Sequence, residues 1–174
     1  MSDVPERPGR VRGSTRSVGV LGWPVDHSLS PVIHNAAFVA LGLDWVYVPL
    51  PVAPAELPAA LEGLGALGFA GANVTMPHKT STAELIADLS EDARLLRAVN
   101  TIVVGVEGLV GHNSDAAGFE RFLRDDAGFD ATGRSALLFG AGGGARACAL
   151  AAARSGLADL SVAVREVSRH LARP

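Results

Sequence analysis

Residues 71–79 read GANVTMPHK, and this stretch decides the fold. The apolar run over residues 69–74 ends inside it, which predicts a buried strand that stops at a polar edge. Because side chains alternate along a strand with a period of two, Asn73 and Thr75 point to the same side. Lys79 follows once Pro77 has turned the chain. The stretch therefore predicts a strand end that brings an amide, a hydroxyl and an ammonium group together, a set suited to a small oxygen-rich molecule.

Short apolar strands alternate with helical segments on both sides of this stretch. The two strands nearest the middle of the chain are separated by a short turn that contains glycine, which predicts a hairpin. The alternation as a whole predicts an α/β domain over residues 17–126, with a mostly parallel mixed sheet that carries an antiparallel edge. Strands are expected at 18–22, 45–50, 69–74, 101–104 and 109–111, and helices at 31–41, 54–64, 81–88, 91–96 and 116–126.

The rest of the chain predicts a second, incomplete unit. After a boundary near residues 127–133, a buried strand, an alanine-rich helix and another strand are expected at 135–139, 143–155 and 160–164. This order is typical of the first part of a Rossmann-like dinucleotide-binding domain, which is assigned residues 127–174. One more helix is predicted to start over 166–173. Residues 1–16 carry charges of both signs without an apolar core and are expected to form a disordered tail.

Composition narrows the class of protein. The 174 residues are 48% hydrophobic and 19% charged, which is typical of a globular chain. The net charge of −3 argues against nucleic acid or an anionic membrane as a partner. A single cysteine, Cys148, excludes an internal disulfide framework, and the five histidines lack metal-ligand spacing, so no metal site is expected. With no apolar run of membrane length and no secretory signal, we expect a soluble cytoplasmic protein.

Three further polar motifs can be interpreted in two ways each. Ser28 and Ser30 precede a helix and could hold a carboxylate at its N-terminus, or Ser30 could simply cap that helix. Asn100, in AVNT, could satisfy backbone groups at a strand entrance. Asp115, in GHNSDAAGF, could cap the helix that follows it.

A glycine-rich loop at the start of the second unit predicts dinucleotide binding. Residues 136–146 read ALLFGAGGGAR, so that a Gly-x-Gly-x-x-Ala pattern follows a strand and opens a helix. In such a loop the first glycine permits the turn, the second lets a pyrophosphate approach the backbone, and the alanine allows close packing. A tight turn without a ligand is the alternative. The candidate cofactor-binding residues here are Gly140, Gly142, Gly143, Ala145 and Arg146.

In this order, the motifs resemble those of the shikimate dehydrogenase family, from about Ser17 to the end of the chain. The resemblance implies that Lys79 and Asp115 are catalytic, and we expect them to act as a coupled pair in proton transfer. Ser114 stands where the family commonly has threonine and keeps the hydroxyl. The resemblance implies that Ser28 and Ser30 bind the carboxylate of shikimate, and that Asn73, Thr75 and Asn100 contact the rest of the substrate.

The resemblance also implies a nicotinamide cofactor. At the end of the next strand the family's NADP-using members typically have Asn-Arg-Thr, and this chain has Val164-Arg165-Glu166, so that only Arg165 matches. Arginine favours the 2′-phosphate of NADP, whereas the neighbouring Glu166 leaves NAD open.

The expected function is therefore the NADP-dependent, reversible reduction of 3-dehydroshikimate to shikimate in aromatic amino-acid biosynthesis. Two alternatives stay open: a catalytically silent fragment that binds shikimate-like acids, and a quinate/shikimate dehydrogenase that uses NAD. Because the chain stops early in the dinucleotide-binding domain, we expect a homodimer or a partner that supplies the missing C-terminal half.

Overall fold

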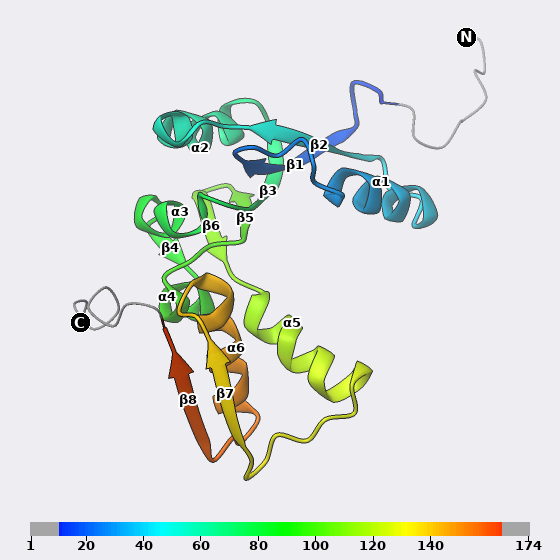
Figure 1. Ribbon diagram of the computed structural model, residues 1–174. Helices are drawn as coiled ribbons and strands as arrows, with labels where there is room; N and C mark the ends of the chain where they lie inside the picture. Colours follow the sequence, from blue (N-terminus) through cyan, green and yellow to red (C-terminus); the bar gives the residue numbers. More distant parts are fainter. Residues whose placement is uncertain (1–10, 165–174) are drawn as a thin grey trace.

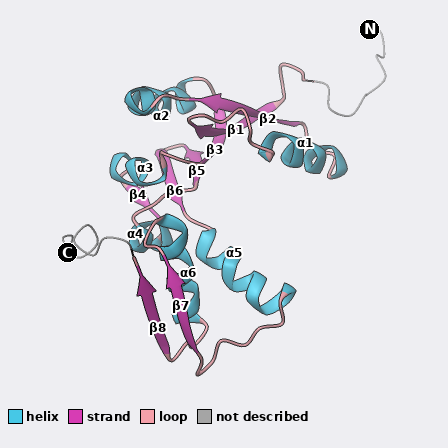
Figure 2. Cartoon of the chain, in the orientation of Figure 1, coloured by secondary structure: helices cyan, strands magenta, loops and turns pink. Residues whose placement is uncertain are grey.

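The computed structural model describes residues 11–164 and consists of a six-stranded sheet with its helices, followed by a smaller β–α–β unit (Figures 1 and 2). The strands are β1 (Arg16–Gly22), β2 (Trp45–Pro51), β3 (Phe69–Val74), β4 (Asp88–Leu89), β5 (Thr101–Gly105), β6 (Gly108–His112), β7 (Ser135–Phe139) and β8 (Asp159–Ala163). The helices are α1 (Ser30–Ala40), α2 (Leu57–Ala66) after the 3-10 turn η1 (Pro54–Glu56), α3 (Lys79–Leu85), α4 (Glu91–Leu96), α5 (Asp115–Arg121) with its π-helical continuation η2 (Phe122–Asp126), and α6 (Gly143–Arg154).

The large sheet is mixed and mostly parallel, as predicted. Its strand order is β2-β1-β3-β5-β6-β4, and β5 alone runs antiparallel to its neighbours. The predicted position of the antiparallel strand was wrong, because β5 lies inside the sheet and β4 forms that edge. β4 pairs in parallel with β6 through Asp88 and Leu89, residues that were expected at or just after the end of a helix. A strand of two residues has no periodicity that a sequence could reveal.

The main core lies between this sheet and α2. Leu57, Leu61 and Leu64 are buried and recur at the three- and four-residue spacing of one helix face. They pack with Leu21, Ala72, Val74, Ile86, Ala93, Val99 and Ile102. Val74 ends β3, so the strand that leads to Lys79 is anchored at its last residue.

The outer edge of β2 is closed to pairing with a further strand. Tyr47 turns its N–H and C=O away from β1, and the side-chain amide of Asn35 on α1 binds both at 2.9 Å. Pro49 and Pro51 follow at the same two-residue period and have no N–H to offer on that side. The edge therefore lacks the free donors that edge-to-edge association requires.

The N-terminal end of the described chain belongs to the fold. β1 begins at Arg16, whose guanidinium lies 4.5 Å from the centre of the Trp45 ring. Just before it, Ser14 and Thr15 donate hydrogen bonds of 2.8 and 2.6 Å to Asp44. These bonds hold the pKa of Asp44 below its usual value. Residues 14–16 are thus ordered, and the predicted tail over 1–16 extends too far at this end.

Gly71 allows β3 and β5 to approach each other, and we expect Gly71→Ala to destabilise the chain by about 3 kcal/mol. A Cβ at this position would lie 2.2 Å from the backbone oxygen of Ile102. Because the obstacle is backbone in a neighbouring strand, relief requires the two strands to separate. Urea unfolding followed by circular dichroism measures the free energy of unfolding.

Gly65→Ala is the matched control for this prediction. Gly65 lies in α2, and an added Cβ there has nothing within 4 Å. Alanine should raise helix propensity and stabilise the chain by about 0.5 kcal/mol. Equal unfolding free energies for Gly71→Ala and the wild type would show that the β3–β5 approach is not tight.

The second unit, β7–α6–β8, has its elements where they were predicted, but β7 is not buried. β7 and β8 pair in parallel, and among residues 11–164 they have no further strand partner. Leu137 and Phe139 on β7 are 58% and 78% exposed. The apolar sequence of β7 predicts a strand buried on both faces, yet only one face of β7 meets α6.

α6 joins this unit to the large sheet. Its Ala147 and Ala151 are buried against Ala116 of α5 and Leu96 of α4. At the end of α6 the Arg154 guanidinium binds both carboxylate oxygens of Asp92. This contact lowers the pKa of Asp92. α6, the helix that follows the glycine-rich loop, therefore packs against Ala116, which is next to Asp115 in the sequence.

Candidate active site

Lys79 is presented by the start of a helix. After β3, the Met76–Pro77 peptide is cis and α3 begins at Lys79, two residues before its predicted start. His78 is 2% exposed, and its Nε2 lies 2.7 Å from the carbonyl oxygen of Val52. This buried contact fixes the backbone immediately before Lys79.

The ammonium of Lys79 meets the carboxylate of Asp115. Nζ donates to Oδ2 over 2.7 Å, and each side chain is 31% exposed, so the pair is held by the protein yet open to a ligand. Lys79 is the only lysine among the 174 residues, which contain 15 lysines and arginines in total. A compact ammonium differs in chemistry from the planar, permanently charged guanidinium, so this position differs from the arginines of the sequence.

Asp115 is the first residue of α5 and does not cap it. The residue before α5 is Ser114, which makes no side-chain capping bond. Asn113 takes that part instead: its Oδ1 accepts the Asp115 N–H at 2.8 Å, and its Nδ2 donates to the Ala98 carbonyl at 2.9 Å. Sequence reasoning missed Asn113, although an asparagine two residues before a helix start is a known signal for such a turn.

Asn100 orients Asp115. Its Nδ2 donates to Asp115 Oδ1 at 2.7 Å and to Ser114 Oγ at 3.0 Å. Its Oδ1 accepts from the Thr101 hydroxyl at 2.9 Å and from the Ser114 N–H at 3.2 Å. Because both amide hydrogens are engaged, Asn100 would have to give up a bond before it could donate to a ligand. Its predicted contact with substrate stays a prediction.

Asn73 and Thr75 lie at the same end of β3. Asn73 donates to Thr101 Oγ1 at 3.2 Å and to the Asn100 carbonyl at 3.4 Å, and accepts from the Tyr47 hydroxyl at 2.7 Å. The hydroxyl of Thr75 has no partner among the described residues and is free to bind a ligand.

Ser28 and Ser30 lie in the turn that leads into α1. Ser28 Oγ accepts the Ser30 N–H at 3.3 Å, while the capping position of α1 falls on Leu29 without a side-chain bond. The interpretation of Ser30 as the helix cap was therefore wrong. Nearby, the Tyr47 hydroxyl donates to Asn73, which is bonded in turn to Asn100 and through it to the Lys79–Asp115 pair.

The glycine-rich loop fits a dinucleotide. Gly140 has a φ of +101°, a conformation that suits glycine, and α6 begins at Gly143 with Gly142 at its capping position and no side-chain cap. The space that a Cβ would occupy at Gly142, Gly143 and Gly144 is open. Uncapped N–H groups at a helix start bind phosphate.

Arg146, in the first turn of α6, supports the same interpretation. Its Nε is buried and has no hydrogen-bond partner among the described residues, so a donor is left over at the loop. Ala145 follows the open glycines and leads into the face of α6 that packs on α5. Arg165 lies outside the described residues.

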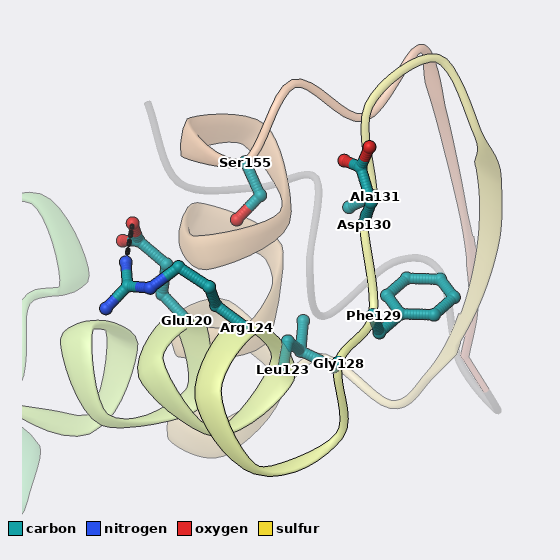
Figure 3. Close-up of a pocket in the computed structure, with 8 residues that line it drawn as sticks. All are labelled: Glu120, Leu123, Arg124, Gly128, Phe129, Asp130, Ala131 and Ser155. Atoms are coloured by element: carbon teal, nitrogen blue, oxygen red, sulfur yellow. Dashed lines mark ion pairs between the residues drawn. The ribbon is translucent and has the colours of Figure 1, made fainter.

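A separate pocket of about 390 Å³ lies between α5, the turn after η2 and the end of α6 (Figure 3). Arg124, the positively charged residue of the lining, is already paired, because it lies 3.9 Å from Glu120 and 2.8 Å from Asp125. The pocket includes none of the candidate site residues, so we assign it no ligand. Its lining residues are Glu120, Leu123, Arg124, Gly128, Phe129, Asp130, Ala131 and Ser155.

Residues 11–164 contain no cluster of three or more potential metal ligands. Within the same residues, no helix has the length and apolar character needed to span a membrane.

Comparison with known proteins agrees with this geometry. The family model for the shikimate dehydrogenase substrate binding domain matches residues 20–102. The shikimate dehydrogenase (NADP(+)) of Geobacter metallireducens is 49% identical over 159 residues, which are 91% of this chain and 56% of that protein. The chain thus spans little more than half the length of this relative.

Solved structures give the same result. A shikimate dehydrogenase crystallised with NADP+ superimposes with a TM-score of 0.87 at 36% identity, over 95% of this chain and 56% of the other. Shikimate 5-dehydrogenase from Listeria monocytogenes, crystallised with shikimate and NAD, gives a TM-score of 0.84 at 40% identity, over 90% of this chain and 54% of the other. With sequence motifs, fold and site geometry in agreement, the chain is similar to the shikimate dehydrogenases, and it matches their substrate binding domain over residues 20–102.

Proposed function

We propose that this chain provides the substrate site and the first part of the cofactor site of an NADP-dependent dehydrogenase that interconverts 3-dehydroshikimate and shikimate. The observation that carries the proposal is the 2.7 Å contact between Lys79 Nζ and Asp115 Oδ2 at the end of β3. A partly exposed ammonium next to an oriented carboxylate is the arrangement that reduction of a ring carbonyl requires.

Lys79 is proposed to handle the proton. Reduction of a carbonyl places negative charge on its oxygen, and an ammonium that lies beside this oxygen neutralises the charge by donating a proton. In the reverse direction the neutral amine of Lys79 takes the proton from the hydroxyl of shikimate. Asp115 accepts bonds from Lys79 and Asn100 on separate oxygens, so it holds the amine in one place. The two residues act as a coupled pair.

The remaining site residues are proposed to bind and orient the substrate. Ser28 and Ser30 hold the carboxylate at the start of α1, while Asn73, Thr75 and Asn100 contact the ring hydroxyls.

NADP is the cofactor proposed for this site, and when bound it supplies or accepts the hydride. Gly140, Gly142 and Gly143 would receive the pyrophosphate at the open start of α6. Ala145 would allow α6 to pack close to β7, and Arg146, with its unpartnered Nε, would face the phosphates. Arg165, outside the described residues, is kept from the sequence as a candidate for the 2′-phosphate. Curated relatives named for NADP(+) support this choice, and NAD remains the alternative because a related structure holds it with shikimate. The reaction belongs to aromatic amino-acid biosynthesis.

A second candidate is binding of shikimate-like acids without turnover. It is favoured by one observation: among the described residues the β7–α6–β8 unit has two strands, with Leu137 and Phe139 exposed. A parallel sheet normally has both faces covered.

Two measurements on the chain separate these functions. Isothermal titration calorimetry measures shikimate binding, and the absorbance of NADPH measures shikimate-dependent NADP reduction, each repeated with quinate and with NAD. Binding together with reduction is the expected result. Binding without reduction would establish the silent binder, and absence of shikimate binding would refute both functions.

A further inference from the structure

Tyr47 is a buried residue that contacts one end of the proposed substrate site. It lies in β2, is 3% exposed, and donates its hydroxyl hydrogen to Asn73 Oδ1 over 2.7 Å. Asn73 lies near the end of β3, in the strand that leads to Lys79.

The position of the Tyr47 hydroxyl is fixed from several directions. Asn35 holds the Tyr47 backbone through two hydrogen bonds of 2.9 Å. The His34 ring stacks on the tyrosine ring with 4.3 Å between centroids and 3° between planes. Val20 and Val25 complete the buried surroundings, with Phe38 packed against them. The phenol therefore has little freedom to follow a mobile partner.

From Tyr47 onward, each side chain donates a hydrogen bond to the next one. A phenol has one hydrogen, and the Oδ1 of Asn73 receives that of Tyr47. Asn73 must then turn its Oδ1 toward Tyr47 and its Nδ2 toward Thr101. Thr101 passes its own hydrogen to Asn100, and Asn100 donates to Asp115.

Burial keeps this donor in place at working pH. Loss of water contacts raises the pKa of Tyr47 to about 12. The phenol hence stays protonated wherever the chain is folded and active. As long as the phenol is protonated, the orientation of the Asn73 amide does not change with pH.

We infer that Tyr47 is a positioning residue of the proposed substrate site: its hydroxyl sets the orientation of the Asn73 amide, which is bonded in turn to Thr101 and Asn100. The inference rests on the proposed function for the identity of the ligand. The effect of Tyr47 on Asn73 does not depend on any ligand, so the positioning role and the proposed function can fail separately.

The variant Tyr47→Phe removes the hydroxyl and keeps the ring. In the ligand-free chain, we expect hydrogen exchange of the Asn73 side-chain amide, followed by NMR, to become about tenfold faster, because Oδ1 loses its only donor. The shikimate dissociation constant should also rise about tenfold.

Trp45→Phe is the matched control. Trp45 lies in the same strand, two residues away, and its ring contacts are with Phe38 and Arg16. It should leave both the Asn73 amide and the shikimate dissociation constant within about twofold of the wild type. Should Tyr47→Phe fail to fold, His34→Ala loosens the Tyr47 ring without removing the hydroxyl and should change the Asn73 exchange rate in the same direction.

The outcomes are distinct. Faster Asn73 exchange with weaker shikimate binding supports the positioning role. Unchanged Asn73 exchange in a folded Tyr47→Phe chain overturns it, whatever happens to binding. Faster exchange in a chain whose wild type does not bind shikimate supports the positioning of Asn73 and refutes the proposed function.

Discussion

Lys79→Met is expected to lower the rate of shikimate-dependent NADP reduction by about a thousandfold while weakening shikimate binding less than tenfold. Methionine keeps most of the length of the side chain and its apolar stem. What is lost is the ammonium that lies 2.7 Å from Asp115 and is proposed to give its proton to the carbonyl oxygen. Because this interaction develops in the transition state, its loss should appear in kcat rather than in the binding of the ground state. Steady-state kinetics and calorimetry measure the two quantities.

Lys79→Arg separates proton transfer from charge. A guanidinium keeps the positive charge beside Asp115 but does not release a proton at any working pH. If proton transfer is the role of Lys79, the arginine variant should lose activity nearly as completely as the methionine variant. Recovery of the rate to within about tenfold of the wild type would show that charge alone is sufficient.

The local part of the fold could be predicted from the sequence. The bounds of β3, α4 and β7 are those that were predicted. Each follows from an apolar pattern or a capping signal within a few residues, such as the Ser90 hydroxyl that accepts the Ala93 N–H at the start of α4. The alternation of strands and helices likewise predicted a mostly parallel sheet.

Features that depend on distant partners could not be predicted in this way. β4 is a strand only because Val110 and Gly111 lie beside it, and β5 is internal because β3 and β6 pair with it on either side. β7 has the composition of a buried strand, but its exposure is decided by what covers it. No local pattern in these segments carries that information.

The candidate site likewise combines residues that short motifs predict with one residue whose role depends on a distant partner. Lys79, Asp115, Asn100 and Asn73 were proposed from short motifs, and the structure brings them into one hydrogen-bonded network. Tyr47 escaped notice because it lies in an ordinary strand, and its hydroxyl reaches Asn73 across 26 positions of sequence. A lone tyrosine between valines is most often a packing residue.

Asp115→Asn is expected to reduce the rate by about a hundredfold or more, although it changes few atoms. The wild-type carboxylate accepts from Lys79 on Oδ2 and from Asn100 on Oδ1. An asparagine has one acceptor oxygen and one NH2 group, so one of these two donors would face another donor. If Asn100 keeps the oxygen, Lys79 loses its partner and moves toward solvent. Steady-state kinetics measures the rate, and the Nζ resonance of Lys79, unambiguous because it is the only lysine, reports its release.

Asp125→Asn is the matched control for this substitution. Asp125 is in η2, beyond the end of α5, and pairs with the exposed Arg124 at the surface. The same chemical change there should alter the rate less than about twofold, because exposed ion pairs contribute little. A rate for Asp115→Asn within tenfold of the wild type, with the Lys79 resonance unmoved, would mean that the amine is held by groups other than the carboxylate. In that case Lys79 would act alone, and the coupled pair would have to be abandoned in favour of a single proton donor.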